Sequence, residues 1–63
     1  MKTVKISLEI IHETEESLYF YDGEMRAWVA KKLIPNYDPD WEPGPQTVEA
    51  EIPLWLAVKI GWI

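Results

Sequence analysis

Apolar and polar residues alternate along residues 3–12, where Val4, Ile6, Leu8 and Ile10 share one face. Side chains of a β-strand point alternately to its two faces, so this pattern predicts a strand with one face towards a core. Ile11 and His12 interrupt the alternation, which predicts a bulge or an exit from the sheet at that end. Residues 47–52 alternate in the same way and predict a closing strand.

Two further strand-like runs, residues 17–21 and 24–30, flank the dipeptide Asp22-Gly23. Asp-Gly is typical of a two-residue type I′ turn, which predicts a hairpin with Tyr21 opposite Glu24 and Phe20 opposite Met25. The predicted core face of this hairpin carries Leu18, Phe20, Met25, Ala27 and Val29. The predicted outer face is aromatic and amphipathic, with Tyr19, Tyr21, Glu24, Arg26 and Trp28.

The remaining segments predict a loop and a helix. Residues 31–34 form either a turn or the start of a short helix, and residues 35–46 hold four of the five prolines, which predicts an irregular loop. Pro53 suits the first position of a helix over residues 54–60, and Gly61 suits its C-terminal end. The expected fold is therefore mainly β with one short C-terminal helix, an α+β arrangement in the order β-β-β-loop-β-α. Four strands predict a small bent antiparallel sheet or a partly open barrel.

Length and composition bound what the chain holds. Sixty-three residues suffice for a single domain over 1–63, with a thin core to which the eight aromatic residues contribute strongly. There is no cysteine and there is one histidine, so disulfides and the usual zinc sites are excluded. We expect neither a metal nor a cofactor.

The formal net charge of −5 opposes binding to nucleic acid or to an anionic membrane, because both require cationic side chains. It suits a basic protein partner, although acidic residues also simply keep a hydrophobic chain soluble. No secretory leader and no membrane-spanning run is expected, so the predicted location is cytoplasmic.

Candidate catalytic groups are sparse, and we expect no enzyme. His12 is the one imidazole, and Ser7 and Ser17 are the only serines, which is a poor basis for nucleophilic catalysis.

Residues 38–42 carry oxygen ligands at alternating positions, as a calcium loop does. Pro43 stands where such a loop needs its glycine, so the calcium interpretation is disfavoured.

Two surfaces exceed what a plain small fold requires. The first is an acidic and aromatic loop, our candidate partner-binding site: Tyr37, Asp38, Asp40, Trp41 and Glu42. Trp41 either tucks back to cap the core or anchors a partner. The second is the C-terminal helix. One apolar stripe, Leu56, Ile60 and Ile63, is enough for this helix to pack on the sheet. The apolar residues left over form our candidate oligomer interface: Leu54, Trp55, Val58 and Trp62. The alternative is a sheet that curls around the helix and covers them.

Two segments resemble a group of short phage- and prophage-type proteins of unassigned function. Residues 22–34 are similar to a DG…W-L-P-K-S-x-I run, and residues 52–63 to an I/V-P-x-W-L-A-x-K-x-G-L-I run. This chain departs from the first run at two positions, with Ala30 in place of the proline and Lys32 in place of the serine. Leu54, Val58 and Ile60 stand where polar or charged residues are expected in the second, which makes this helix more apolar. The resemblance implies a phage-related protein and brings no site residues.

These observations lead to three hypotheses of function. The first is a small acidic protein-binding module, in the manner of a phage-type accessory or inhibitor protein, that occludes a basic surface of a host complex. Its acidic side chains would be Glu13, Glu15, Glu16, Asp38, Asp40 and Glu42. The second is a structural homo-oligomer, in the simplest case a homodimer, joined through the apolar helix. The third is a small β-barrel that binds nucleic acid through Tyr19, Tyr21 and Trp28.

Overall fold

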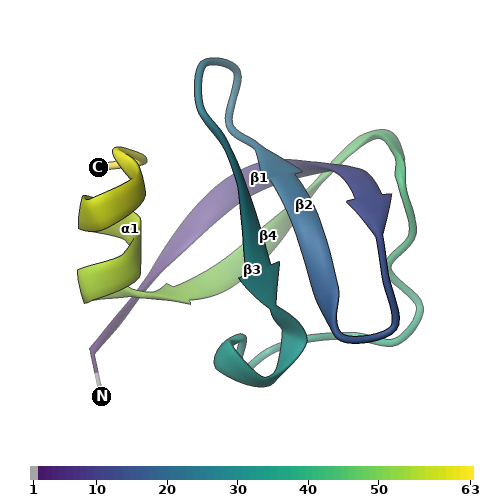
Figure 1. The fold of residues 1–63 in the computed structure, drawn as a ribbon, viewed down its shortest axis with the longest axis horizontal. Helices are drawn as coiled ribbons and strands as arrows, with labels where there is room; N and C mark the ends of the chain where they lie inside the picture. Colours follow the sequence, from purple (N-terminus) through teal and green to yellow (C-terminus); the bar gives the residue numbers. More distant parts are fainter. Residues whose placement is uncertain (1) are drawn as a thin grey trace.

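The computed structural model describes residues 2–63 and contains one antiparallel four-stranded sheet followed by a short helix (Figure 1). The strands are β1 (Thr3–Glu13), β2 (Ser17–Tyr21), β3 (Arg26–Ala30) and β4 (Gly44–Pro53). A 3₁₀ turn, η1 (Lys31–Leu33), follows β3, and the helix α1 (Leu54–Ile60) follows β4. The predicted α+β class and element order are confirmed.

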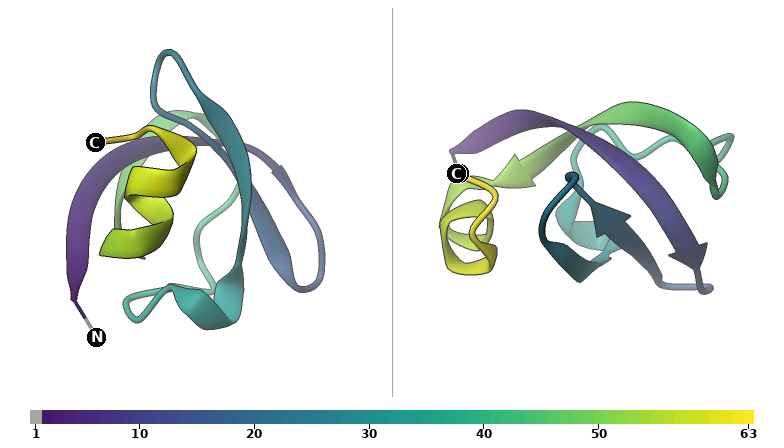
Figure 2. Two further views of the ribbon diagram at one scale, coloured as in Figure 1. Left: turned by 60° about the vertical axis from the view of Figure 1, so that its left-hand side comes forward. Right: turned by 90° about the horizontal axis from the view of Figure 1, so that it is seen from above.

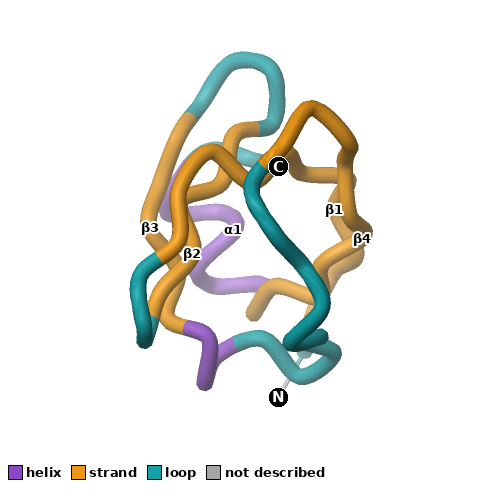
Figure 3. Tube along the Cα trace, turned by 90° about the vertical axis from the view of Figure 1, so that its right-hand side faces the viewer, coloured by secondary structure: helices purple, strands orange, loops and turns teal. Residues whose placement is uncertain are grey.

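The strand order β3-β2-β1-β4 leaves β3 and β4 as the two edges of an open sheet. The long strands β1 and β4 run side by side and arch over the helix, while the short β2–β3 hairpin lies further along β1 (Figures 1 and 2). The register of β1 against β2 shifts between Ile10 and His12, which confirms the predicted irregularity at that end of β1. Seen from the side in Figure 3, the strands curve into an open arc that does not close into a barrel.

The β2–β3 hairpin differs from its predicted register. Leu18 lies opposite Val29 and Phe20 opposite Ala27, so the connection spans residues 22–25 and not two residues. A type I′ turn needs positive φ at both central positions, and here only Gly23, with φ of 107°, has it. The Asp22 carboxylate instead accepts hydrogen bonds from the amides of Glu24 and Met25 at 2.8 and 2.7 Å, which builds a wider turn.

Because the register is displaced by two residues, the faces of β2 and β3 stay as predicted. Leu18, Phe20 and Val29 point into the core. Met25 is the exception, since it lies in the wider turn and is exposed.

The core lies between the concave side of the sheet, η1 and α1. Its members come from all four strands, from the end of η1, and from α1 and the residues after it: Leu8, Ile10, Leu18, Phe20, Val29, Ile34, Ala50, Ile52, Ala57 and Trp62. Ile34, directly after η1, also enters the core. No buried polar side chain is found among residues 2–63, so the core is held by apolar packing.

The helix α1 occupies the predicted residues. Gly61 has φ of 99°, and the amides of Gly61 and Trp62 both donate to the carbonyl oxygen of Ala57, which ends the helix in a left-handed cap. Pro53 is the last residue of β4 and precedes the helix. Along the part of the chain that the structure describes, no helix has the length and hydropathy that crossing a membrane requires.

Candidate functional site

The proline-rich segment is an ordered loop over residues 34–43, because β4 begins at Gly44, earlier than predicted. Pro45 fits within β4 since this strand is a sheet edge, where a residue without an N–H is tolerated. The Asp38 carboxylate accepts a hydrogen bond from the Asp40 amide at 2.9 Å, and the Trp41 amide donates to the Asp38 carbonyl oxygen at 3.0 Å. These bonds form a compact turn at the centre of the loop.

Asn36 fixes this loop to the outer edge of β4. Its Nδ2 donates to the Glu49 carbonyl oxygen at 2.9 Å, and its Oδ1 accepts from the Glu51 amide at 2.8 Å. One side chain therefore takes the place of a paired strand residue and covers part of this edge. No feature of the sequence distinguished Asn36 from an ordinary loop asparagine, because its partners lie on a strand that follows it by more than ten residues.

The candidate partner-binding residues divide into two groups. Tyr37 and Trp41 pack against the core, with ring centroids 5.8 Å apart and the ring planes perpendicular. Trp41 thus follows the tucked alternative and caps the core while remaining partly accessible. Asp38, Asp40 and Glu42 are exposed. The structure brings all five predicted residues together on one loop, with the aromatic rings inward and the carboxylates outward.

Ion pairing leaves most carboxylates uncompensated. Among residues 2–63, the one salt bridge joins the Lys31 ammonium to Glu13 at 2.7 Å. The hydrogen bond to Glu13 raises the pKa of Lys31, and Lys31 also lies 5.4 Å from the centre of the Tyr37 ring. The carboxylates of the 34–43 loop have no cationic partner within the same residues.

The outer surface of α1 agrees with the predicted interface in part. Trp55 and Val58 are more than half exposed and lie one turn apart, next to Lys59. Leu54 is half-buried. The expectation that Trp62 is left over at the surface is wrong. Its exposure is 7%, its ring packs edge-on against Phe20 at 6.1 Å, and its Nε1 donates to the Met25 carbonyl oxygen at 3.1 Å.

The predicted apolar stripe of α1 also requires correction. Leu56 and Ile60 pack against the core as expected, but Ile63 is 60% exposed. The left-handed conformation at Gly61 turns the chain, so that Trp62 enters the core in the place predicted for Ile63. Ala57, which lies outside the predicted stripe, is the fully buried residue of the helix.

The outer face of the hairpin carries a second aromatic cluster. The rings of Tyr19 and Trp28 lie across the strands with centroids 4.8 Å apart and planes tilted by 30°. The Arg26 guanidinium lies 4.9 Å from the centre of the Tyr21 ring. Trp28 keeps 51% of its surface exposed, so this face presents an accessible aromatic ring with a cation on the same face.

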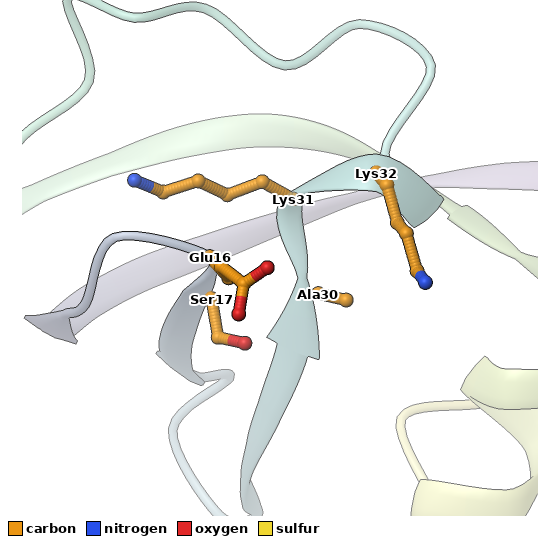
Figure 4. Close-up of a pocket in the computed structure, with 5 residues that line it drawn as sticks. All are labelled: Glu16, Ser17, Ala30, Lys31 and Lys32. Atoms are coloured by element: carbon orange, nitrogen blue, oxygen red, sulfur yellow. The ribbon is translucent and has the colours of Figure 1, made fainter.

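A shallow depression of about 380 Å³ lies where β3 runs into η1 (Figure 4). The residues that line it are Glu16, Ser17, Ala30, Lys31 and Lys32. Figure 4 shows the two lysine side chains pointing away from each other, so they do not converge on one ligand position. Within residues 2–63, no three His, Cys, Asp or Glu side chains are grouped so that they could hold a metal ion.

Comparison of the chain with protein-family models, with curated proteins and with solved structures returned no match. The resemblance to phage-type proteins therefore stays a prediction, and the function rests on the geometry described above.

Proposed function

We propose that this protein is a small, non-catalytic module that binds a basic surface of another protein through the acidic loop of residues 37–42. The observation that carries the proposal is the exposed set Asp38, Asp40 and Glu42, which has no cationic partner among residues 2–63. A partner that supplies Lys or Arg would compensate these charges.

Preorganisation of the loop supports the same function. The Asp38 turn, the Asn36 bridge to β4 and the inward rings of Tyr37 and Trp41 hold the backbone that carries the carboxylates. A loop already fixed in one conformation loses little entropy on binding, so more of the electrostatic attraction is retained as affinity. Occlusion of a basic groove, as an inhibitor of a host complex would act, is the mechanism that this surface suits.

The test uses a defined basic probe, an oligolysine peptide, with binding followed by calorimetry at several salt concentrations. We expect binding that weakens steeply as salt rises, because the attraction is between exposed charges. A triple variant, Asp38→Asn, Asp40→Asn and Glu42→Gln, should abolish it while keeping the hydrogen-bonding oxygens.

A matched control changes the net charge equally at other turns: Glu15→Gln, Glu16→Gln and Glu24→Gln. Glu15 and Glu16 belong to the wider acidic set predicted from the sequence, but they lie on the turn between β1 and β2, outside the loop to which we assign binding. This control should bind nearly as well as the unaltered chain. Equal losses in the two triple variants would mean that only the net charge attracts the probe, and binding that ignores salt would contradict the proposal outright.

The stacked pair on the outer face of the hairpin favours a second candidate function, binding of single-stranded nucleic acid. Tyr19, Trp28 and Arg26 offer the aromatic faces and the cation that such sites use. The net charge of −5 opposes it. Filter binding of labelled single strands at low salt, with Trp28→Ala as the variant, tests it: retention that Trp28→Ala abolishes supports this function, and no retention rejects it.

A further inference from the structure

Most of the exposed apolar side chains of this protein gather around α1. Trp55 and Val58 lie on the outer side of the helix, and Ile63 follows its end. Met25 belongs to the hairpin turn, but its side chain lies against Gly61, with its Cε 3.8 Å from the position that a Cβ there would take. Four of the five large apolar side chains that are exposed among residues 2–63 therefore form one surface, the α1 patch: Met25, Trp55, Val58 and Ile63.

The same surface carries a cation. Lys59 is the one charged residue of α1, and it lies on the same side of the helix as Trp55, four positions earlier. Within residues 2–63, Lys59 forms no ion pair and its ammonium lies over no aromatic ring. The Trp55 ring likewise packs against no other ring of the described chain. The α1 patch thus offers a cation and an aromatic face that the single chain does not bring together.

We propose that α1 packs antiparallel against α1 of a second copy of this chain, about a two-fold axis at the level of Ala57. In such a pair, a residue after the axis on one helix faces the residue equally far before it on the other. Lys59 of each copy therefore faces Trp55 of the other, and two cation–π contacts form together. The two Val58 side chains lie beside the axis and bury each other.

The distribution of charge favours a second copy as the occupant of this patch. Each chain carries a net charge of −5, so two copies approach most easily through a surface without carboxylates, and α1 has none. In Figures 1 and 2, the loop of residues 34–43 lies on the side of the molecule opposite α1, so this pairing keeps the two acidic loops apart. A basic protein would instead meet Lys59, and an anionic membrane would be repelled by the net charge.

The size of the α1 patch sets the strength of the dimer. Four partly exposed side chains fall short of the roughly 800 Å² per partner that stable complexes bury. We therefore expect a weak dimer that forms at high protein concentration. At the micromolar concentrations of an unfolding measurement the protein is a single chain.

The measurement is sedimentation equilibrium of the full chain up to millimolar concentration. Trp55→Ala and Trp28→Ala are a matched pair, because the two rings are 55% and 51% exposed and lie on different faces. We expect the unaltered chain and Trp28→Ala to dimerise equally, and Trp55→Ala to dimerise at least about tenfold more weakly, since each dimer loses two aromatic anchors. Val58→Glu should abolish the dimer, because it sets two carboxylates beside the axis.

Lys59 distinguishes this pairing from a simple apolar contact. Lys59→Met makes the patch more apolar while removing both cation–π contacts, so we expect the dimer to weaken about fivefold or more. Lys32→Met, on η1, changes the net charge equally and should have little effect. Lys59→Arg should retain the dimer, because a guanidinium also stacks on an indole. In a mixture of isotope-labelled and unlabelled chains, nuclear Overhauser contacts between Lys59 and the Trp55 ring of different copies should appear.

A chain that stays monomeric at millimolar concentration would overturn this inference, and so would equal losses in the two tryptophan variants. A dimer that Lys59→Met leaves intact or tightens would rule out the antiparallel pairing. The inference is independent of the acidic loop, whose triple variant should leave the dimer intact.

Discussion

The indole of Trp62 donates a hydrogen bond to the carbonyl oxygen of Met25, which ties the segment after α1 to the turn of the β2–β3 hairpin. The same ring packs edge-on against Phe20 at the centre of the core. The segment after α1 is thus part of the core, and Trp62 joins it to the hairpin.

This contact predicts a large loss of stability for Trp62→Ala. Removal of a buried tryptophan costs roughly 3–5 kcal/mol, which is most of the stability of a small domain. Trp62→Phe should keep most of the packing and lose chiefly the hydrogen bond, at about 1 kcal/mol. Urea denaturation followed by circular dichroism measures both.

Trp55→Ala is the matched control, because Trp55 is 55% exposed on the outer side of the same helix. Its effect should stay within about 0.5 kcal/mol. Equal losses for Trp55 and Trp62 variants would contradict the assignment of Trp62 to the core.

Asn36 supplies a second prediction. Asn36→Ala removes both hydrogen bonds to the β4 edge and should lower the free energy of unfolding by about 1–3 kcal/mol. The Glu51 amide should then exchange with solvent faster, as hydrogen–deuterium exchange would show. Asn36→Asp keeps an acceptor for that amide but sets an oxygen against the Glu49 carbonyl group, so it should not restore stability. Unchanged exchange at Glu51 would remove Asn36 from this role.

The three glycines should respond differently to alanine. Gly23 and Gly61 have φ of 107° and 99°, so a Cβ at either position strains the backbone by about 1–2 kcal/mol even though there is space for it. Gly44 has no positive φ, and a methyl group at this position would have no other atom within 4 Å, so Gly44→Ala should be neutral or slightly stabilising. Thermal unfolding of the three variants gives the order, and a loss at Gly44 matching that at Gly61 would refute the backbone explanation.

Asp22 predicts a pH dependence. Hydrogen bonds from the amides of Met25 and Glu24 lower the pKa of its carboxyl group below the ordinary value. A pKa lowered by folding contributes stability above the unfolded pKa, near 3.9, and that stability is lost as the pH falls through the folded pKa. The amide resonances of Glu24 and Met25 should therefore titrate with a midpoint below about 3.9.

Asp22→Asn retains the accepting oxygen and removes the charge, so its amides should show no such titration. The acid-induced decrease in stability should also be smaller in this variant than in the unaltered chain. Amide resonances that titrate identically in the two chains would exclude Asp22 as the cause.

Local patterns in the sequence were sufficient to predict the individual elements of this protein. Period-two alternation located β1 and β4, and Pro53 and Gly61 bracketed α1, because these signals depend on residues that are neighbours in the chain. The two faces of the hairpin were also predicted, even though its register was wrong, since a displacement of two residues preserves side-chain direction. The acidic loop was recognisable from composition alone.

Contacts between residues distant in sequence determined the rest. Whether Trp62 or Ile63 enters the core depends on the turn at Gly61 and on the position of Phe20, some forty residues earlier. The Asn36 bridge required β4 to lie beside the loop, and only the strand order of the folded sheet places it there. The local pattern determines which face of a strand is apolar. The packing of the whole chain determines which strand edges are covered and which aromatic rings are buried.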